Sequence, residues 1–170
     1  MTLHWVPATD RIDLLADPVA QAVPELEGVE VTEIDPGLAD TAEFCERYGV
    51  TLDESANCVV VAAKRGGETR YAACMVLATM RVDVNGVVRR HLEARKASFA
   101  PMADAVELTG MEYGGITPLG LPADWPILVD THVAEHPRVV IGSGVRRSKL
   151  AVSGAALAGL KGAEVLPLAG

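Results

Sequence analysis

A glycine-rich segment, residues 109–120, is the densest concentration of residues in this chain that could do chemistry. It reads Thr-Gly-Met-Glu-Tyr-Gly-Gly-Ile-Thr-Pro-Leu-Gly and holds four glycines and one proline. Glycine allows positive φ and a close approach of the main chain to a ligand, while Pro118 stiffens the segment and restricts Thr117 to extended conformations. Several main-chain N–H groups of such a loop can converge on a phosphate or an oxyanion. A plain turn between two strands explains the composition equally well.

A second glycine cluster, residues 141–149, combines a short loop with three cations. It reads Ile-Gly-Ser-Gly-Val-Arg-Arg-Ser-Lys and follows a predicted strand. Within an acidic chain this loop is the best local candidate for anion binding, and a solvated hairpin is the alternative. Another basic group, at residues 89–96, falls near a predicted helix end, where cations are more often solvated or complement the helix dipole.

Other catalytic patterns find little support in the sequence. The glycine-rich segments match neither a Walker A loop nor a Rossmann fingerprint, and Ser143 lacks the full spacing of a nucleophile elbow. His132 and His136 are four residues apart but follow a strand, so we expect no metal site. Asp130, which follows the apolar Ile-Leu-Val, is either a site carboxylate at a strand end or a turn residue, and the turn is favoured.

The composition fits one globular domain. The chain has 170 residues, of which 49% are hydrophobic and 4% aromatic, and it carries a net charge of −8. No apolar run is long enough for a transmembrane helix, the N-terminus lacks a signal-peptide pattern, and the odd number of cysteines indicates reduced thiols. We therefore expect a cytoplasmic protein. The negative charge excludes a general nucleic-acid coat, so a nucleic acid would have to bind at a local basic patch.

The elements that position these segments alternate irregularly around one hairpin, whose turn is predicted at residues 64–68 by Gly66 and Gly67. This order predicts a single mixed α/β domain. A valine-rich run predicts a fully buried strand, and Thr41 and Gly49 are expected to cap a helix between them. We expect residues 1–28 to form an N-terminal arm that holds a short helix within 10–28, broken by Pro18 and Pro24, and residues 29–170 to form the domain. The predicted strands are 29–32, 58–63, 71–78, 127–129 and 138–141; the predicted helices are 42–48, 83–92, 102–108 and 153–160.

These segments resemble the YbaK/EbsC family of prolyl-tRNA editing-domain-like proteins. Residues 109–120 resemble the family's Gly-x-x-x-Pro loop, and residues 73–79, 128–130 and 142–144 resemble other family segments in the same order. The resemblance covers roughly residues 40–165. It implies a central mixed sheet, curled toward a partial barrel, with flanking helices.

The resemblance implies an aminoacyl-tRNA deacylase without a cofactor or metal, acting in trans on a Cys- or Ala-tRNA(Pro)-like substrate. Its partner is the aminoacylated 3′ end of the tRNA, and the loop would surround the ester. In family members acting on cysteine the substrate's thiol attacks, so a protein nucleophile is not required. The catalytic positions implied are Asn57, Gly114, Gly115 and Pro118. The substrate-binding positions implied are Thr79, Lys96, Ile116, Thr117, Asp130, Gly142, Ser143, Gly144, Arg146 and Lys149.

One departure from the family concerns a lysine that usually precedes the first long strand. Asn57 stands at that position, within about one residue, and an amide cannot supply a positive charge. Either another cation, such as Lys149 or Lys96, replaces it, or the reaction has been weakened or lost. The alternative function is therefore a non-catalytic protein of the same fold that binds a nucleotide, an aminoacyl group or a protein. The sequence does not indicate an oligomeric state.

Overall fold

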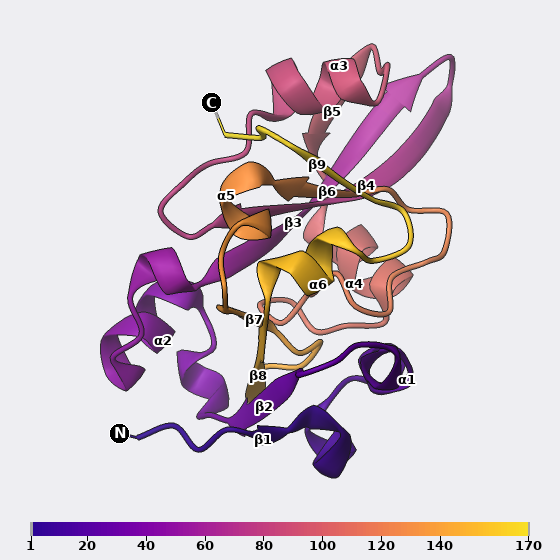
Figure 1. The fold of residues 1–170 in the computed structure, drawn as a ribbon. Coiled ribbons are helices and arrows are strands. Elements are labelled where there is room, and N and C mark those ends of the chain that lie inside the picture. Colours follow the sequence, from indigo (N-terminus) through magenta and orange to yellow (C-terminus); the bar gives the residue numbers. More distant parts are fainter. Residues whose placement is uncertain (1, 170) are drawn as a thin grey trace.

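The strands of the protein fall into two sheets that meet at one corner (Figure 1). A computed structural model describes residues 2–169. The first sheet is antiparallel, in the order β1 (Val6–Pro7), β2 (Glu30–Glu33), β8 (Ser148–Val152) and β7 (Val139–Gly142). The second has the order β5 (Lys96–Phe99), β3 (Ala56–Arg65), β4 (Glu68–Leu77), β6 (Ile127–Asp130) and β9 (Ala163–Leu166).

The second sheet is mixed, because β4, β6 and β9 run parallel while β5, β3 and β4 are antiparallel. A parallel bridge between Ser55 and Val140 joins the start of β3 to β7. Among the described residues the strands do not close into a barrel. The prediction of a single mixed α/β domain is confirmed.

Short helices cover these sheets and connect their strands. They are α1 (Asp17–Ala22), α2 (Thr41–Tyr48), α3 (Arg89–His91), α4 (Met102–Thr109), α5 (Thr131–Ala134) and α6 (Gly154–Ala158). A π-helical turn, Val84–Val88, leads into α3, and Asp83 caps it by accepting hydrogen bonds from two main-chain N–H groups. No helix among residues 2–169 is long and apolar enough to cross a membrane.

The β3–β4 hairpin follows from its sequence. Valine and alanine side chains fill both faces of β3, as a doubly covered strand requires, and its middle residues are buried. Gly66 and Gly67 both have positive φ, 59° and 82°, which a two-residue hairpin turn demands. Arg65 and Glu68 therefore lie opposite each other at the tip, and the predicted hairpin is present.

Helix α2 ends as the sequence indicates but begins one residue away from the predicted cap. Gly49 adopts the left-handed conformation (φ 71°) that terminates the helix. The N-cap is Asp40, and Thr41 is already the first helical residue, so the prediction of a Thr41 cap is wrong. The Thr41 hydroxyl is bound to a side chain on β3 instead.

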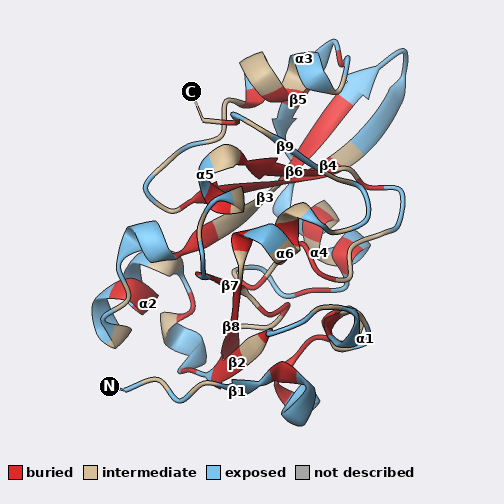
Figure 2. Cartoon of the chain, in the orientation of Figure 1, coloured by how far each residue is buried: buried red, intermediate tan, exposed pale blue. Residues whose placement is uncertain are grey.

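Residues 2–28 contribute to the core. Strand β1 pairs with β2, and the side chains of Leu14, Val19 and Val23 are buried in the largest hydrophobic cluster. Pro18 lies in the first turn of α1, where its missing N–H costs nothing, so it starts a helix. Figure 2 shows buried residues along the central strands and exposed residues at the hairpin tip.

Candidate functional site

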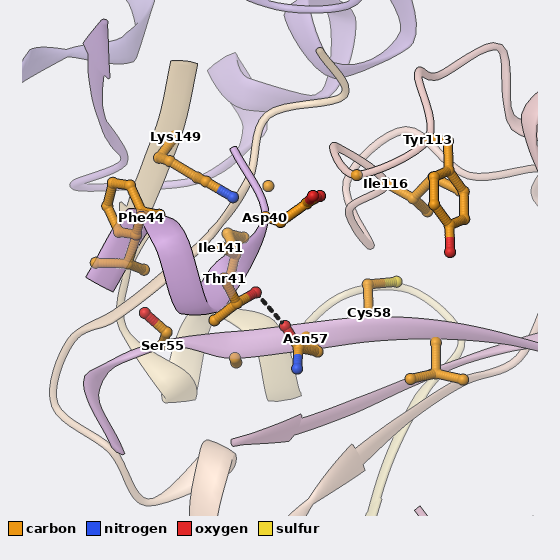
Figure 3. Close-up of a pocket in the computed structure, with 15 residues that line it drawn as sticks. Asp40, Thr41, Phe44, Ser55, Asn57, Cys58, Tyr113, Ile116, Ile141 and Lys149 are labelled. Atoms are coloured by element: carbon orange, nitrogen blue, oxygen red, sulfur yellow. Dashed lines mark hydrogen bonds between the residues drawn. The ribbon is translucent and has the colours of Figure 1, made fainter. Parts of the chain in front are cut away.

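A cavity of about 300 Å³ opens where the two sheets meet (Figure 3). Its wall is formed by the N-terminal end of α2, the start of β3, the glycine-rich loop and the facing ends of β7 and β8. The volume is at the lower end of the range for small-molecule sites. The cavity therefore brings both glycine-rich segments singled out in the sequence to one place.

Lys149, in β8, is the buried cation of this cavity. Only 7% of the residue is exposed, its Nζ donates a 2.7 Å hydrogen bond to the Ala39 carbonyl, and it lies 5.3 Å from the centre of the Phe44 ring. Burial, assisted by the nearby Arg146 and opposed by Asp40, lowers the pKa of Lys149 to about 8. The ammonium form is thus the major form at neutral pH. An ammonium has three donors, so after the bond to Ala39 two remain for a ligand.

Asn57, in β3, lines the same cavity. Its Oδ1 accepts a 2.7 Å hydrogen bond from the Thr41 hydroxyl, and Figure 3 shows its amide nitrogen directed away from Thr41. Among residues 2–169 this amide nitrogen has no hydrogen-bond partner. Asn57 can therefore offer N–H donors but no charge, and the charge in the cavity comes from Lys149.

The glycine-rich loop forms another wall, to which Tyr113, Gly114 and Ile116 contribute. The buried Gly115 anchors the loop, since its N–H donates to Glu112 at 3.0 Å and its carbonyl accepts from Gly144 at 2.7 Å. In the described part of the chain, the N–H groups of Gly114 and Ile116 make no hydrogen bond with the protein. Both residues line the cavity, so their N–H groups are candidates for binding a ligand oxygen.

Gly115 is required for packing. A Cβ at this position would lie 2.9 Å from main-chain atoms of Val145, closer than real Cβ atoms approach. The glycine-rich loop and the 142–145 turn therefore touch through their main chains. This contact fixes the path of the loop along the cavity.

Arg146 ties the rim of the cavity together. Its Nη1 donates to Asp40 Oδ1 at 3.1 Å and to the Tyr113 carbonyl at 3.2 Å, and its Nε donates to the Pro36 carbonyl at 3.2 Å. One guanidinium thus connects the segment before α2 to the glycine-rich loop. Arg146 positions the walls and does not line the cavity itself.

Part of the predicted set lines the cavity, namely Asn57, Gly114, Ile116, Gly142 and Lys149. The other predicted positions lie outside it: Thr79, Lys96, Gly115, Thr117, Pro118, Asp130, Ser143, Gly144 and Arg146. Asp130 accepts hydrogen bonds from the main-chain N–H groups of His132 and Leu168, so it holds α5 and the C-terminal segment. The Ser148 hydroxyl donates a 2.7 Å hydrogen bond to the hydroxyl oxygen of Ser143.

The sequence offers two lysines, Lys149 and Lys96, as substitutes for the family lysine. The structure places only one of them in the cavity. Lys149 contributes to the cavity, whereas Lys96 is exposed on the edge strand β5 opposite Lys64. The sequence does not distinguish the two lysines, because the glycines and cations of residues 141–149 predict a single loop. Lys149 is in fact the second residue of a buried strand.

Several cavity residues carried no signal in the sequence. Asp40, Thr41 and Phe44 come from the start of α2 and its N-cap, which the sequence predicts only as a helix capped at Thr41, and Cys58 comes from the valine-rich strand. Burial raises the pKa of the Cys58 thiol far above its ordinary value, so it remains protonated. Cys58 therefore presents a neutral thiol to the cavity wall.

Solved structures share this fold. A candidate trans-editing enzyme for prolyl tRNA synthetase superposes with a TM-score of 0.77 at 22% sequence identity, over 91% of this chain and 96% of that chain. The hypothetical protein APE2540 superposes with a TM-score of 0.73 at 22% identity, over 82% of this chain and 90% of that chain. At this level of identity the similarity shows the common architecture.

The family follows from the sequence itself. The family model of the aminoacyl-tRNA editing domain matches residues 35–160, which is most of the chain and includes every element around the cavity. The chain belongs to the aminoacyl-tRNA editing domain family. The resemblance to YbaK-type proteins drawn from the glycine-rich segments is confirmed.

Proposed function

We propose that this protein is an aminoacyl-tRNA deacylase, which hydrolyses the ester between an amino acid and the terminal ribose of a mischarged tRNA. The observation that carries the proposal is the buried Lys149 ammonium, with two unused donors, in a cavity shared with the glycine-rich loop. Membership of the editing-domain family supports the same reaction. The fold shared with a candidate trans-editing enzyme for prolyl tRNA synthetase is consistent with action in trans on a Cys- or Ala-tRNA(Pro)-like substrate.

In the proposed reaction a water oxygen bonds to the ester carbonyl carbon, and the carbonyl oxygen becomes an oxyanion. The bond between the acyl carbon and the ribose oxygen then breaks as the carbonyl re-forms. A proton that came with the water ends on the ribose oxygen, which becomes a hydroxyl. The Lys149 ammonium and the N–H groups of Gly114 and Ile116 stabilise the oxyanion, because fixed donors in a partly dry site favour developing charge. Asn57 adds neutral donors beside them.

We assign to Asp40 the binding of the substrate's amino group. Among the described residues that line the cavity it is the only one with a carboxylate. One of its oxygens pairs with Arg146 at 3.1 Å, which leaves the other free to accept from an α-ammonium. An aminoacyl ester carries such an ammonium, whereas an N-acetylated ester does not. We expect N-acetylaminoacyl-tRNA to be hydrolysed more slowly than aminoacyl-tRNA, and the difference to shrink in Asp40→Asn.

A deacylation panel tests the proposal. tRNAs charged with Ala, Cys, Ser and Pro are incubated with micromolar protein, and ester loss is compared with that in buffer alone. We expect at least one ester to be hydrolysed by the wild type and by Lys161→Met, which removes an exposed lysine elsewhere, but not by Lys149→Met. Hydrolysis at the buffer rate for every ester would overturn the deacylase proposal in favour of a non-catalytic binder. That alternative is supported by the asparagine at position 57, where the resemblance to the family implies a lysine.

A further inference from the structure

The segment from residue 64 to residue 96 has a charge opposite to that of the rest of the protein. It contains eight Lys or Arg and three Asp or Glu, a net charge of +5, whereas the whole chain carries −8 and the remaining residues therefore carry −13. In Figure 1 the hairpin tip, β5 and α3 lie together at one end of the molecule. The positive charge is thus concentrated in space as well as in sequence.

At the hairpin tip, four of these cations line one shallow groove of about 390 Å³: Lys64, Arg65, Arg95 and Lys96. We call this group the basic patch. All four residues are exposed, and Glu68 is the one carboxylate that also lines the groove. The patch therefore has a local charge of +3.

The arrangement of the basic patch is unfavourable without an anion. Lys64 and Lys96 are direct cross-strand partners, so their side chains leave the same face of neighbouring strands. Like charges in this position destabilise a sheet. Within residues 2–169 none of the four cations forms an ion pair with a carboxylate, and Arg65 donates only to the Glu93 carbonyl. An external polyanion would remove the repulsion.

Strand β3 connects the basic patch to the cavity, because Asn57 lies near its start and Lys64 near its end. The seven intervening steps, at about 3.3 Å each, separate the two sites by roughly 23 Å. A tRNA whose terminal ribose is in the cavity extends away as an unpaired 3′ segment and then as a duplex stem. The separation suits contact between the patch and the first phosphates of that stem.

We infer that the basic patch binds the sugar–phosphate backbone of the acceptor stem while the esterified 3′ end occupies the cavity. This inference rests on the proposed deacylase function and adds a second contact surface to it. Lys and Arg that contact phosphates release counterions, so their contribution to binding falls as salt rises. The rest of the chain, which is strongly acidic, repels the RNA duplex and so favours its binding at the basic patch.

Direct binding is the first test. A fluorescently labelled RNA stem-loop with an unpaired 3′ CCA end is titrated with wild-type protein, with Lys64→Gln/Lys96→Gln, and with Arg11→Gln/Lys161→Gln, which removes the same charge from exposed positions outside the patch. We expect the patch variant to bind about tenfold more weakly at low salt, with the slope of log K against log salt reduced by about 1.4–1.8. The control should match the wild type.

Kinetics is the second test and separates the two proposals. With aminoacyl-tRNA the patch variant should show a KM raised about tenfold and an unchanged kcat, while a short aminoacylated CCA oligonucleotide should be hydrolysed as by the wild type. If the wild type hydrolyses both substrates but the patch variant leaves the KM for tRNA unchanged, the patch inference is overturned and the deacylase proposal stands.

Two further outcomes bear on the binding experiment. Patch-dependent, salt-dependent binding of the stem-loop without any hydrolysis would support the patch inference and overturn the deacylase proposal. Stronger patch-dependent binding of polyglutamate than of the stem-loop would overturn the patch inference, because the patch would then suit an acidic protein segment. Circular dichroism of each variant verifies that it is folded.

Discussion

The Thr41 hydroxyl donates a 2.7 Å hydrogen bond to Asn57 Oδ1, which ties the first turn of α2 to the first residues of β3 inside the cavity. Both groups are partly buried, and the bond links the two elements that carry Asp40 and Cys58 into the cavity wall. Asn57 thus holds the wall of the cavity in place.

Thr41→Val should lower the free energy of unfolding by about 1 kcal/mol, the typical loss when a partly buried hydrogen bond is removed. Urea denaturation measures the change, and Thr9→Val, at an exposed position, is the matched control. The double variant Thr41→Val/Asn57→Ala completes a mutant cycle. Strictly additive effects of the two substitutions would show that the bond contributes nothing.

Lys149→Met should reduce kcat/KM by about 100–1,000-fold, the range found when one oxyanion donor is removed. Methionine has a similar length and fills the space beside Phe44, so we expect the fold to be kept, although the Ala39 carbonyl loses its donor. Deacylation rates and thermal melting are compared with those of Lys161→Met. A folded Lys149→Met protein with undiminished activity would remove Lys149 from the reaction.

The lowered pKa of Lys149 predicts how activity depends on pH. Because the ammonium is the active form, deacylation above the buffer rate should decline as the pH rises through about 8, where Lys149 loses its proton. The rates are measured from pH 6 to pH 9.5 and corrected for spontaneous ester hydrolysis, which itself increases with pH. A corrected rate that keeps rising above pH 8 contradicts the assignment.

The same group predicts the opposite trend for stability. Between about pH 8 and 10.5, the unfolded chain keeps the Lys149 proton and the folded protein has released it. The unfolded state then binds more protons, so stability from this group rises with pH across that window. Lys149→Met should lack this rise, and the comparison of urea midpoints at pH 7.5 and pH 10 measures it.

Local sequence signals account for much of this fold. Valine-rich β3, the Gly66–Gly67 turn and the left-handed Gly49 are determined by neighbouring residues, and each lies where the sequence places it. The sequence does not predict the edge strand β5, because its alternation of polar and apolar residues lasts for only four residues. The sequence does not predict strand β8, because its first residues, Ser148 and Lys149, are polar yet buried.

The site was predicted less completely than the fold, for a physical reason. Glycine spacing identifies a segment whose main chain adopts positive φ or approaches another group closely. It does not identify which atoms of the segment face a cavity. Gly114 lines the cavity while the adjacent Gly115 faces the 142–145 turn. Which lysine enters the cavity depends on how β8 pairs with β7 and β2, and such long-range pairing leaves no local signal.

The contact of Gly115 with Val145 predicts a large effect from one methyl group. In Gly115→Ala the new Cβ would meet the Val145 main chain at 2.9 Å, and main-chain atoms cannot rotate away as a flexible side chain can. The loop or the turn must shift, which should cost about 1–3 kcal/mol of stability, as overpacking does, and displace the N–H groups of Gly114 and Ile116. We expect kcat to fall at least tenfold, because misplaced oxyanion donors lose most of their effect.

Gly159→Ala is the matched control for this substitution. Gly159 follows α6 with φ −90°, and the nearest atom to a Cβ there is 3.5 Å away, so alanine fits without strain. Urea denaturation and deacylation kinetics are measured on both variants. If Gly115→Ala matched Gly159→Ala in stability and kcat, the loop and the turn would not be in main-chain contact, and the position of the glycine-rich loop along the cavity would lose its physical basis.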